Sequence, residues 1–211
     1  MAKRRRVGNL LALAVLSALV ERAMHPYEMA TVLRERGKDR DMPIKWGSLY
    51  TVVQNLEKHG LVRATGSARD GGRPERTVYE LTADGRAELA DWVRELVSTP
   101  EPELPRFKAG LSVLPILPPA EVITLLRRRV DALEAQVAAD QAALAAEPDL
   151  PRVFLIEAEY DLALRAAEIA WVHSLLDELT AGTLSGQALW QAWHDTGQPP
   201  HGGEAFDEGS R

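Results

Sequence analysis

The chain has 211 residues, 45% of them hydrophobic, which is enough for one large or two small domains with a real core. It has no cysteine, which excludes disulfides and thiolate metal sites, and its five histidines do not occur at metal-ligand spacings. The net charge of −6 is unevenly divided: residues 1–98 hold 17 Lys and Arg against 13 Asp and Glu, whereas residues 99–211 hold 8 against 18. We therefore expect the basic first half to meet any phosphate-bearing partner.

The N-terminus combines a basic run at residues 3–6 with an apolar stretch at residues 10–20. This order resembles a secretory signal, which stays open as an alternative. Charged residues follow the apolar stretch directly, without an evident small-residue cleavage site, and this favours a buried first helix over residues 7–22. The basic run then forms an arm that can lie along a DNA backbone. Its arginines are Arg4, Arg5 and Arg6.

Residues 27–36 have the period of a second helix, with Pro26 suited to its first turn and Gly37 at its end. We expect Tyr27 and Leu33 to join the core that the helices enclose. A polar loop over residues 38–43 leads to the central stretch of the chain.

The central stretch, residues 46–62, has the period of an α-helix followed by an extended segment. Leu49, Val52, Val53 and Leu56 form one apolar stripe, and the opposite face is polar and almost free of acids. Gly60 supplies a residue that tolerates positive φ just past the helix end. This pattern is typical of a DNA recognition helix with a β-wing behind it, although an ordinary amphipathic helix has the same stripe.

Two short extended runs, residues 61–67 and 76–81, flank a turn with paired glycines, which predicts a β-hairpin. Arg69, Arg73 and Arg76 surround its tip, and we expect at least one of them to contact phosphate. A fourth helix then opens at the N-cap Thr82 and runs to residue 98, with Trp92 on its apolar stripe.

The second half changes to alanine- and leucine-rich helix after a proline- and acid-rich linker at residues 99–106. Residues 121–146 carry a coiled-coil-like apolar seam and residues 150–181 repeat it, and two such helices cannot hide both seams within one hairpin. A second copy of the chain is the simplest partner. We expect a helical dimerisation domain over residues 107–194 and a disordered tail over residues 195–211.

Three segments resemble a known family: HPYEMA from His25, GSLYTVVQNLEKHGLV from Gly47, and GGRPERTVYELTADGRAEL from Gly71. They are similar to the PadR family of bacterial winged helix-turn-helix transcriptional regulators, over residues 7–98 and only thinly beyond. The resemblance implies a mainly α fold with a small β-wing and a homodimer formed through the C-terminal helices. Pro26 stands where the family usually has glycine, and we expect it to stiffen the second helix. Trp46 is not a generic family residue. Two roles are open for it: packing beneath the central helix, or contact with the DNA backbone.

The resemblance and the local chemistry together give a set of candidate DNA contacts. For positioning on phosphates we expect Arg4, Arg5, Arg6, Lys45, Tyr50, Arg69, Arg73 and Arg76. For base reading we expect Thr51, Gln54 and Asn55; Lys58 can reach either target, and Ser48 completes the set. Some members of the family bind flat aromatic ligands, for which Trp92 and Trp171 are candidates, although a place in the core is the more ordinary role for each.

The expected function is that of a cytoplasmic, homodimeric, sequence-specific DNA-binding regulator, most simply a repressor on a palindromic operator that a small aromatic ligand can release. No catalytic motif or cofactor pattern stands out, so we expect neither an enzyme nor a cofactor. The alternative is a winged-helix module that binds protein, or an anti-repressor without an operator of its own.

Overall fold

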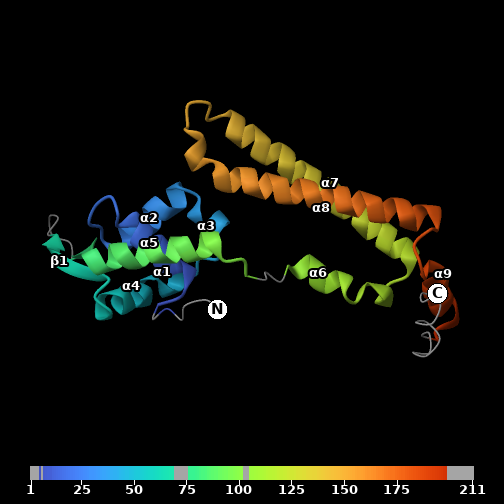
Figure 1. The fold of residues 1–211 in the computed structure, drawn as a ribbon, viewed down its shortest axis with the longest axis horizontal. Helices are drawn as coiled ribbons and strands as arrows, with labels where there is room; N and C mark the ends of the chain where they lie inside the picture. Colours follow the sequence, from blue (N-terminus) through green and yellow to red (C-terminus); the bar gives the residue numbers. More distant parts are fainter. Residues whose placement is uncertain (1–4, 6, 69–75, 102–104, 199–211) are drawn as a thin grey trace. The chain divides into compact units, whose positions relative to one another are not determined.

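The computed structural model describes residues 5, 7–68, 76–101 and 105–198, and the chain divides into two compact units, Met1–Pro102 and Glu103–Arg211. Figure 1 shows that helices make up most of both units and that a small antiparallel sheet belongs to the first. The expected fold class, mainly α with a small β-wing, is confirmed. Among the described helices, none is both long and apolar enough to cross a membrane.

The first unit contains five α-helices, a short 3-10 turn and a two-stranded sheet within its described residues. In chain order they are α1 (Leu10–Ala18), α2 (Pro26–Glu35), α3 (Lys38–Asp41), η1 (Trp46–Ser48), α4 (Leu49–Lys58), β1 (Val62–Ala68), β2 (Arg76–Leu81) and α5 (Ala83–Ser98). The first helix is shorter than the expected 7–22, because Asn9 caps it by accepting a hydrogen bond from the amide of Leu11. The expected loop at residues 38–43 contains α3.

The core of the first unit is built around α1, which is buried on nearly every side and is therefore apolar all round. The expected stripe of α4 packs against it, with Leu49, Val52, Val53 and Leu56 all buried. The expectation that Tyr27 joins this core was wrong, since its ring is 66% exposed. Met24 is buried instead.

The two strands pair antiparallel, from Val62 opposite Leu81 to Ala68 opposite Arg76, with a bulge between Ala64 and Gly66. This hairpin confirms the predicted strands within one residue. The backbones of Met24 and Tyr79 form an isolated bridge, with N···O distances of 2.9 and 3.0 Å, that ties the segment before α2 to the hairpin. The wing is thus anchored to the helical core.

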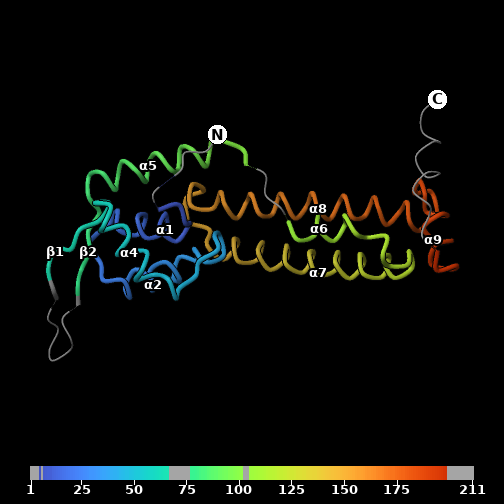
Figure 2. Tube along the Cα trace, turned by 90° about the horizontal axis from the view of Figure 1, so that it is seen from below, coloured from blue at the N-terminus to red at the C-terminus, as the bar shows by residue number. Residues whose placement is uncertain are grey.

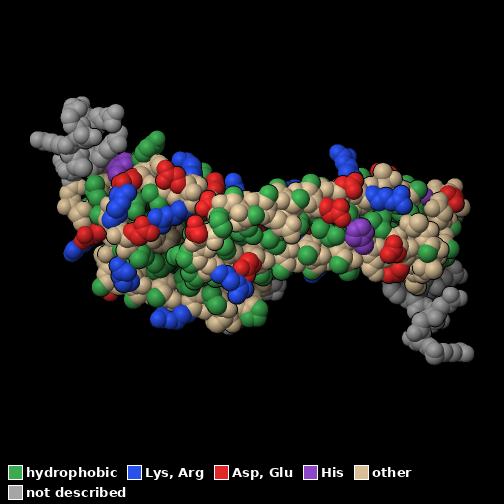
Figure 3. Space-filling model, turned by 90° about the horizontal axis from the view of Figure 1, so that it is seen from above, with side chains coloured by type: hydrophobic (Ala, Val, Ile, Leu, Met, Phe, Trp, Pro, Cys, Tyr) green, Lys and Arg blue, Asp and Glu red, His purple; other side chains and the backbone are tan. Residues whose placement is uncertain are grey.

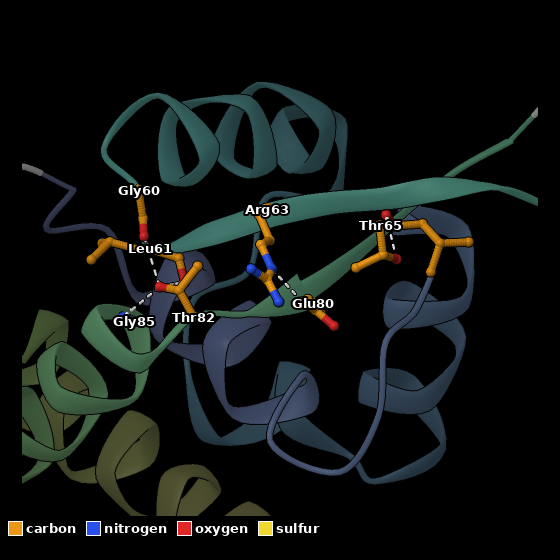
Figure 4. A network of polar contacts seen from close by, with 8 residues as sticks. Gly60, Leu61, Arg63, Thr65, Glu80, Thr82 and Gly85 are labelled. Carbon is orange, nitrogen blue, oxygen red and sulfur yellow. Dashed lines mark hydrogen bonds and ion pairs between the residues drawn. The ribbon is translucent and has the colours of Figure 1, made fainter.

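The junction between the wing and α5 is unusually close (Figure 4). The hydroxyl of Thr82 accepts from the amide of Gly85 at 2.9 Å and lies 2.7 Å from the carbonyl oxygen of Gly60, so one side chain caps α5 and holds the end of α4. A Cβ placed on Gly85 would lie 1.9 Å from the carbonyl oxygen of Leu61. Only glycine therefore fits between α5 and the start of β1.

The second unit is a helical hairpin with shorter helices beside it. Its described elements are α6 (Arg106–Leu111), η2 (Leu114–Ile116), α7 (Pro119–Ala145), η3 (Arg152–Phe154), α8 (Ile156–Ala181) and α9 (Gln187–Thr196). Figure 2 shows α7 and α8 running side by side along their lengths, as expected for the two long helices. The indole of Trp190 on α9 donates to the carbonyl oxygen of Leu117 at 2.8 Å and so fixes the turn before α7.

The apolar seam between α7 and α8 is closed at one end only. The buried cluster consists of Val122, Leu126, Val130, Val172, Leu176 and Leu179. Toward the loop that joins the two helices, the expected seam positions Val137 and Leu144 are only partly buried, and Ala163 on α8 is exposed. The expected tail at residues 195–211 begins inside α9, which ends at Thr196, and residues 199–211 lie outside the described part.

Candidate nucleic-acid interface

The outer face of α4 is a continuous surface of hydrogen-bonding side chains. Its buried stripe turns the other side of the helix to solvent, where the polar residues that the sequence indicated are exposed. They are Tyr50, Thr51, Gln54, Asn55 and Lys58. Their short amide and hydroxyl arms are suited to base edges, and Lys58 and the Tyr50 hydroxyl can donate to phosphate oxygens.

The turn η1 prepares the start of α4. Within it the hydroxyl of Ser48 donates to the carbonyl oxygen of Lys45 at 2.8 Å, so this side chain shapes the turn, while the side chain of Lys45 is exposed. Trp46 is partly buried against the core, and the guanidinium of Arg34 lies 4.3 Å from the centre of its ring. Packing is thus the role of Trp46 in this structure.

A histidine that was not predicted from the sequence lies beside α4. The Nδ1 atom of His25 accepts from the amide of Tyr27 at 3.1 Å and caps α2. The same ring meets the ring of Tyr50 edge to face, with centroids 6.2 Å apart. His25 therefore links the start of α2 to a candidate phosphate contact, and only the fold could reveal this, because 25 residues separate the two.

The wing carries positive charge, but the side chains of the arginines predicted to contact phosphate there are not described by the structure. Arg69 and Arg73 lie outside the described residues, and for Arg76 only the backbone is described. Arg63, which the sequence analysis missed, is exposed on β1 and pairs with Glu80 directly opposite on β2. Part of its charge is therefore balanced within the sheet.

The N-terminal arm departs from the prediction at Arg5, whereas Arg4 and Arg6 lie outside the described residues. The side chain of Arg5 is 4% exposed and bonds to Glu88 and Glu95 of α5. Burial by itself would lower the pKa of Arg5, but these hydrogen bonds and charges outweigh it and raise the pKa above the ordinary value. Arg5 is therefore a structural ion-pair partner, and we remove it from the candidate phosphate contacts.

The two tryptophans considered for ligand stacking occupy different environments. Trp92 is 5% exposed within the core of the first unit, and the guanidinium of Arg5 lies 5.2 Å from the centre of its ring. This burial leaves little ring surface for a ligand. Trp171 on α8 is 49% exposed and contacts Phe107 edge to face at 6.2 Å.

Part of the chain matches a known family. Residues 15–91 match the model of the transcriptional regulator PadR-like family. A protein described as probable transcriptional regulator Rv1176c, from Mycobacterium tuberculosis, is 36% identical over 93 residues. That alignment takes in 42% of this chain and 46% of the relative, so the chain spans about half the length of the curated relative it matches.

Solved structures share the fold over more of the chain. The crystal structure of Bacillus subtilis PadR in complex with operator DNA has a TM-score of 0.67 at 19% identity, covering 81% of this chain and 99% of that one. The same protein in complex with p-coumaric acid gives 0.67 at 18% identity, covering 82% and 99%. The virulence activator AphA of Vibrio cholerae gives 0.60 at 22% identity, covering 81% and 98%. At these identities the likeness to solved structures establishes the fold alone, and the family model adds that residues 15–91 are similar to the transcriptional regulator PadR-like family.

Proposed function

We propose that the protein is a sequence-specific, double-stranded DNA-binding regulator of transcription. The observation that carries the proposal is the outer face of α4, where a helix held by a fully buried stripe presents hydroxyl, amide and ammonium groups to solvent beside an anchored hairpin. A helix of this kind enters the major groove of B-DNA in winged helix-turn-helix proteins. The family that matches is one of regulators rather than enzymes.

The candidate contacts divide into two kinds. Thr51, Gln54 and Asn55 read base edges, because their short polar arms match the donor and acceptor patterns of the major groove. Lys45, Tyr50 and Lys58 fix the register of the helix on phosphates. The wing arginines Arg69, Arg73 and Arg76 and the arm residues Arg4 and Arg6 stay in the second group as expectations from the sequence.

The second unit supports action as a homodimer. On α8, Ile156, Tyr160, Leu164 and Trp171 lie within one narrow stripe of the helix and are each about half exposed or more. Apolar side chains are also visible among the charged ones on the face drawn in Figure 3. A second copy would bury this stripe, and two recognition helices roughly 34–36 Å apart would then favour a palindromic operator.

The regulator would act in the cytoplasm as a repressor, by covering an operator that overlaps a promoter. The relatives are consistent with this mode, because one structure of Bacillus subtilis PadR is a complex with operator DNA and another a complex with p-coumaric acid. Release from DNA by a small molecule is part of the same proposal.

The test is fluorescence anisotropy of the purified protein on the DNA upstream of its own gene and on a scrambled duplex, at several salt concentrations. We expect tight binding to the first duplex only, with an affinity that falls steeply as salt rises, because phosphate contacts release condensed counterions. Equal and salt-insensitive binding to both duplexes would contradict DNA recognition and favour a protein partner.

A further inference from the structure

An apolar groove in the second unit lies between α6, the η2 turn and the first turns of α7. Its volume is about 510 Å³, within the range of small-molecule sites. The side chains of Val122 and Leu126 form a floor that is less than 5% exposed, and Val113 and Ile116 stand at the rim with more than half of their surface in solvent. This unit therefore exposes a concave apolar surface without a partner among the described residues.

The polar side chains that line the groove are both cationic. Arg106 and Arg129 line it, and no acid, hydroxyl or amide side chain does. Arg129 donates its Nε hydrogen to Glu168 at 2.6 Å, and its guanidinium covers the ring of Phe107 at 3.7 Å. Its terminal nitrogens make no hydrogen bond to any described residue, and Arg106 has no ion pair within the same part of the chain. The two guanidinium groups therefore have N–H donors available beside the apolar groove.

The distribution of charge in the second unit also points to an anion. This acidic part of the sequence, residues 103–211, has eight Lys and Arg, and five of them occur in two short runs, residues 106–108 and 127–129. One member of each run lines the groove. The positive charge of an otherwise acidic unit is therefore concentrated where the apolar surface is open.

We propose that this groove binds an amphiphilic organic anion with an aliphatic body and a terminal carboxylate. Leucine, valine and isoleucine side chains would enclose the chain, and Arg106 and the terminal nitrogens of Arg129 would hold the carboxylate through charge-assisted hydrogen bonds. Apart from the two arginines, no lining side chain could pair with a hydroxyl on the ligand body, so an aliphatic chain fits the groove better than a hydroxylated ring. Binding itself does not require DNA, so this proposal and the proposed function can fail separately.

The experiment is isothermal titration calorimetry of the full chain, without DNA, with three probes of equal length: dodecanoate, dodecan-1-ol and dodecyltrimethylammonium. We expect dodecanoate to bind at one site per chain and at least tenfold more tightly than either of the others. Shortening the carboxylate to decanoate should weaken binding about fifteenfold, as expected for two methylenes leaving an apolar site. Equal affinity for the three head groups, or no binding of dodecanoate, would overturn the proposal; the second result would favour the alternative that another copy of the chain covers the groove.

Two pairs of variants locate the site. Arg106→Gln should weaken dodecanoate about tenfold, whereas Arg128→Gln, an exposed residue that does not line the groove, should leave it unchanged. A Cβ on Gly110 meets nothing within 4 Å, so the backbone can accept a side chain there, and the ring of Gly110→Phe should occupy the groove and abolish binding. Ala109→Phe, on the exposed neighbouring residue, is its control. Undiminished binding in both Arg106→Gln and Gly110→Phe, with folding verified by circular dichroism, would exclude this groove.

Discussion

In the first unit the stripe of α4 is at most 5% exposed, whereas α8 in the second unit leaves Ile156, Tyr160 and Leu164 more than half exposed. Helix α4 has one apolar stripe, whereas α8 has apolar side chains on its outer side as well as in the seam with α7, so the two helices also differ in what would have to cover them. Helix α4 packs on α1, which is buried on nearly every side, but α8 has only α7 along most of its length. Near Ile156 and Leu164 the outer apolar side of α8 stays exposed among the described residues, and this is the surface that the proposed dimer would bury.

The largest expected effect comes from a substitution in the core of the first unit. Leu56 on α4 is completely buried, so Leu56→Ala should lower the free energy of unfolding by about 2–5 kcal/mol, through lost apolar contact and the cavity left behind. The measurement is urea denaturation followed by circular dichroism. In contrast, Leu164→Ala should have little effect on the isolated chain but should weaken self-association, which sedimentation equilibrium would detect. A large loss of self-association in Leu56→Ala alone would contradict the assignment of the two roles.

A somewhat smaller effect should follow from a single methyl group at the junction of wing and helix. Gly85→Ala places a Cβ against the carbonyl oxygen of Leu61, and the backbone must shift to accommodate it. We expect a loss of about 1–3 kcal/mol in the free energy of unfolding, typical of overpacking. Gly47→Ala is the matched control, because a Cβ there meets nothing within 4 Å. Equal stability of the two variants in thermal unfolding would show that the close approach in Figure 4 does not constrain the fold.

The parts of the fold that sequence could predict are those governed by local periodicity. The stripe of α4, the two strands and the long helices α7 and α8 all follow from the spacing of apolar residues, and the structure confirms them. The prediction that Tyr27 joins the core was wrong because Met24 fills the core near α2. The backbone bridge to Tyr79 holds Met24 there. Pairing between segments 55 residues apart leaves no signal in local spacing.

The same distinction applies to the candidate site. The exposed face of α4 could be predicted because its residues are neighbours on one helix. The contact of His25 with Tyr50 and the burial of Arg5 against Glu88 could not be predicted, since each depends on a side chain from another element. Tyr79 is a further example, because burial, and after it the charge of Glu57 on α4, raises the pKa of its hydroxyl through contacts that local spacing does not reveal.

The two kinds of DNA contact proposed for α4 can be separated by mutation. Gln54→Ala should remove about 1–3 kcal/mol of discrimination between operator and scrambled duplex, because a side chain that reads a base edge acts only on the correct sequence. Tyr50→Ala should weaken binding to both duplexes alike, as expected for a residue that positions the helix on phosphate. Anisotropy titrations on the two duplexes measure both effects. An unchanged affinity ratio in Gln54→Ala would remove Gln54 from the reading group.

The smallest expected effect concerns Arg5, and it tests whether the arm belongs to the fold or to the DNA. The acids around Arg5 are partly exposed, with 20% of the Glu95 side chain and 25% of the Glu88 side chain in solvent, so screening limits the value of these ion pairs. Arg5→Gln should therefore reduce the free energy of unfolding by only about 1 kcal/mol. Because its guanidinium is bound within the protein, the salt dependence of DNA binding should not change, whereas Lys58→Gln should reduce the salt slope by about one. A reduced slope in Arg5→Gln would show that Arg5 leaves α5 when DNA binds, and the carboxylates of Glu88 and Glu95 would then compete with phosphate for the same side chain.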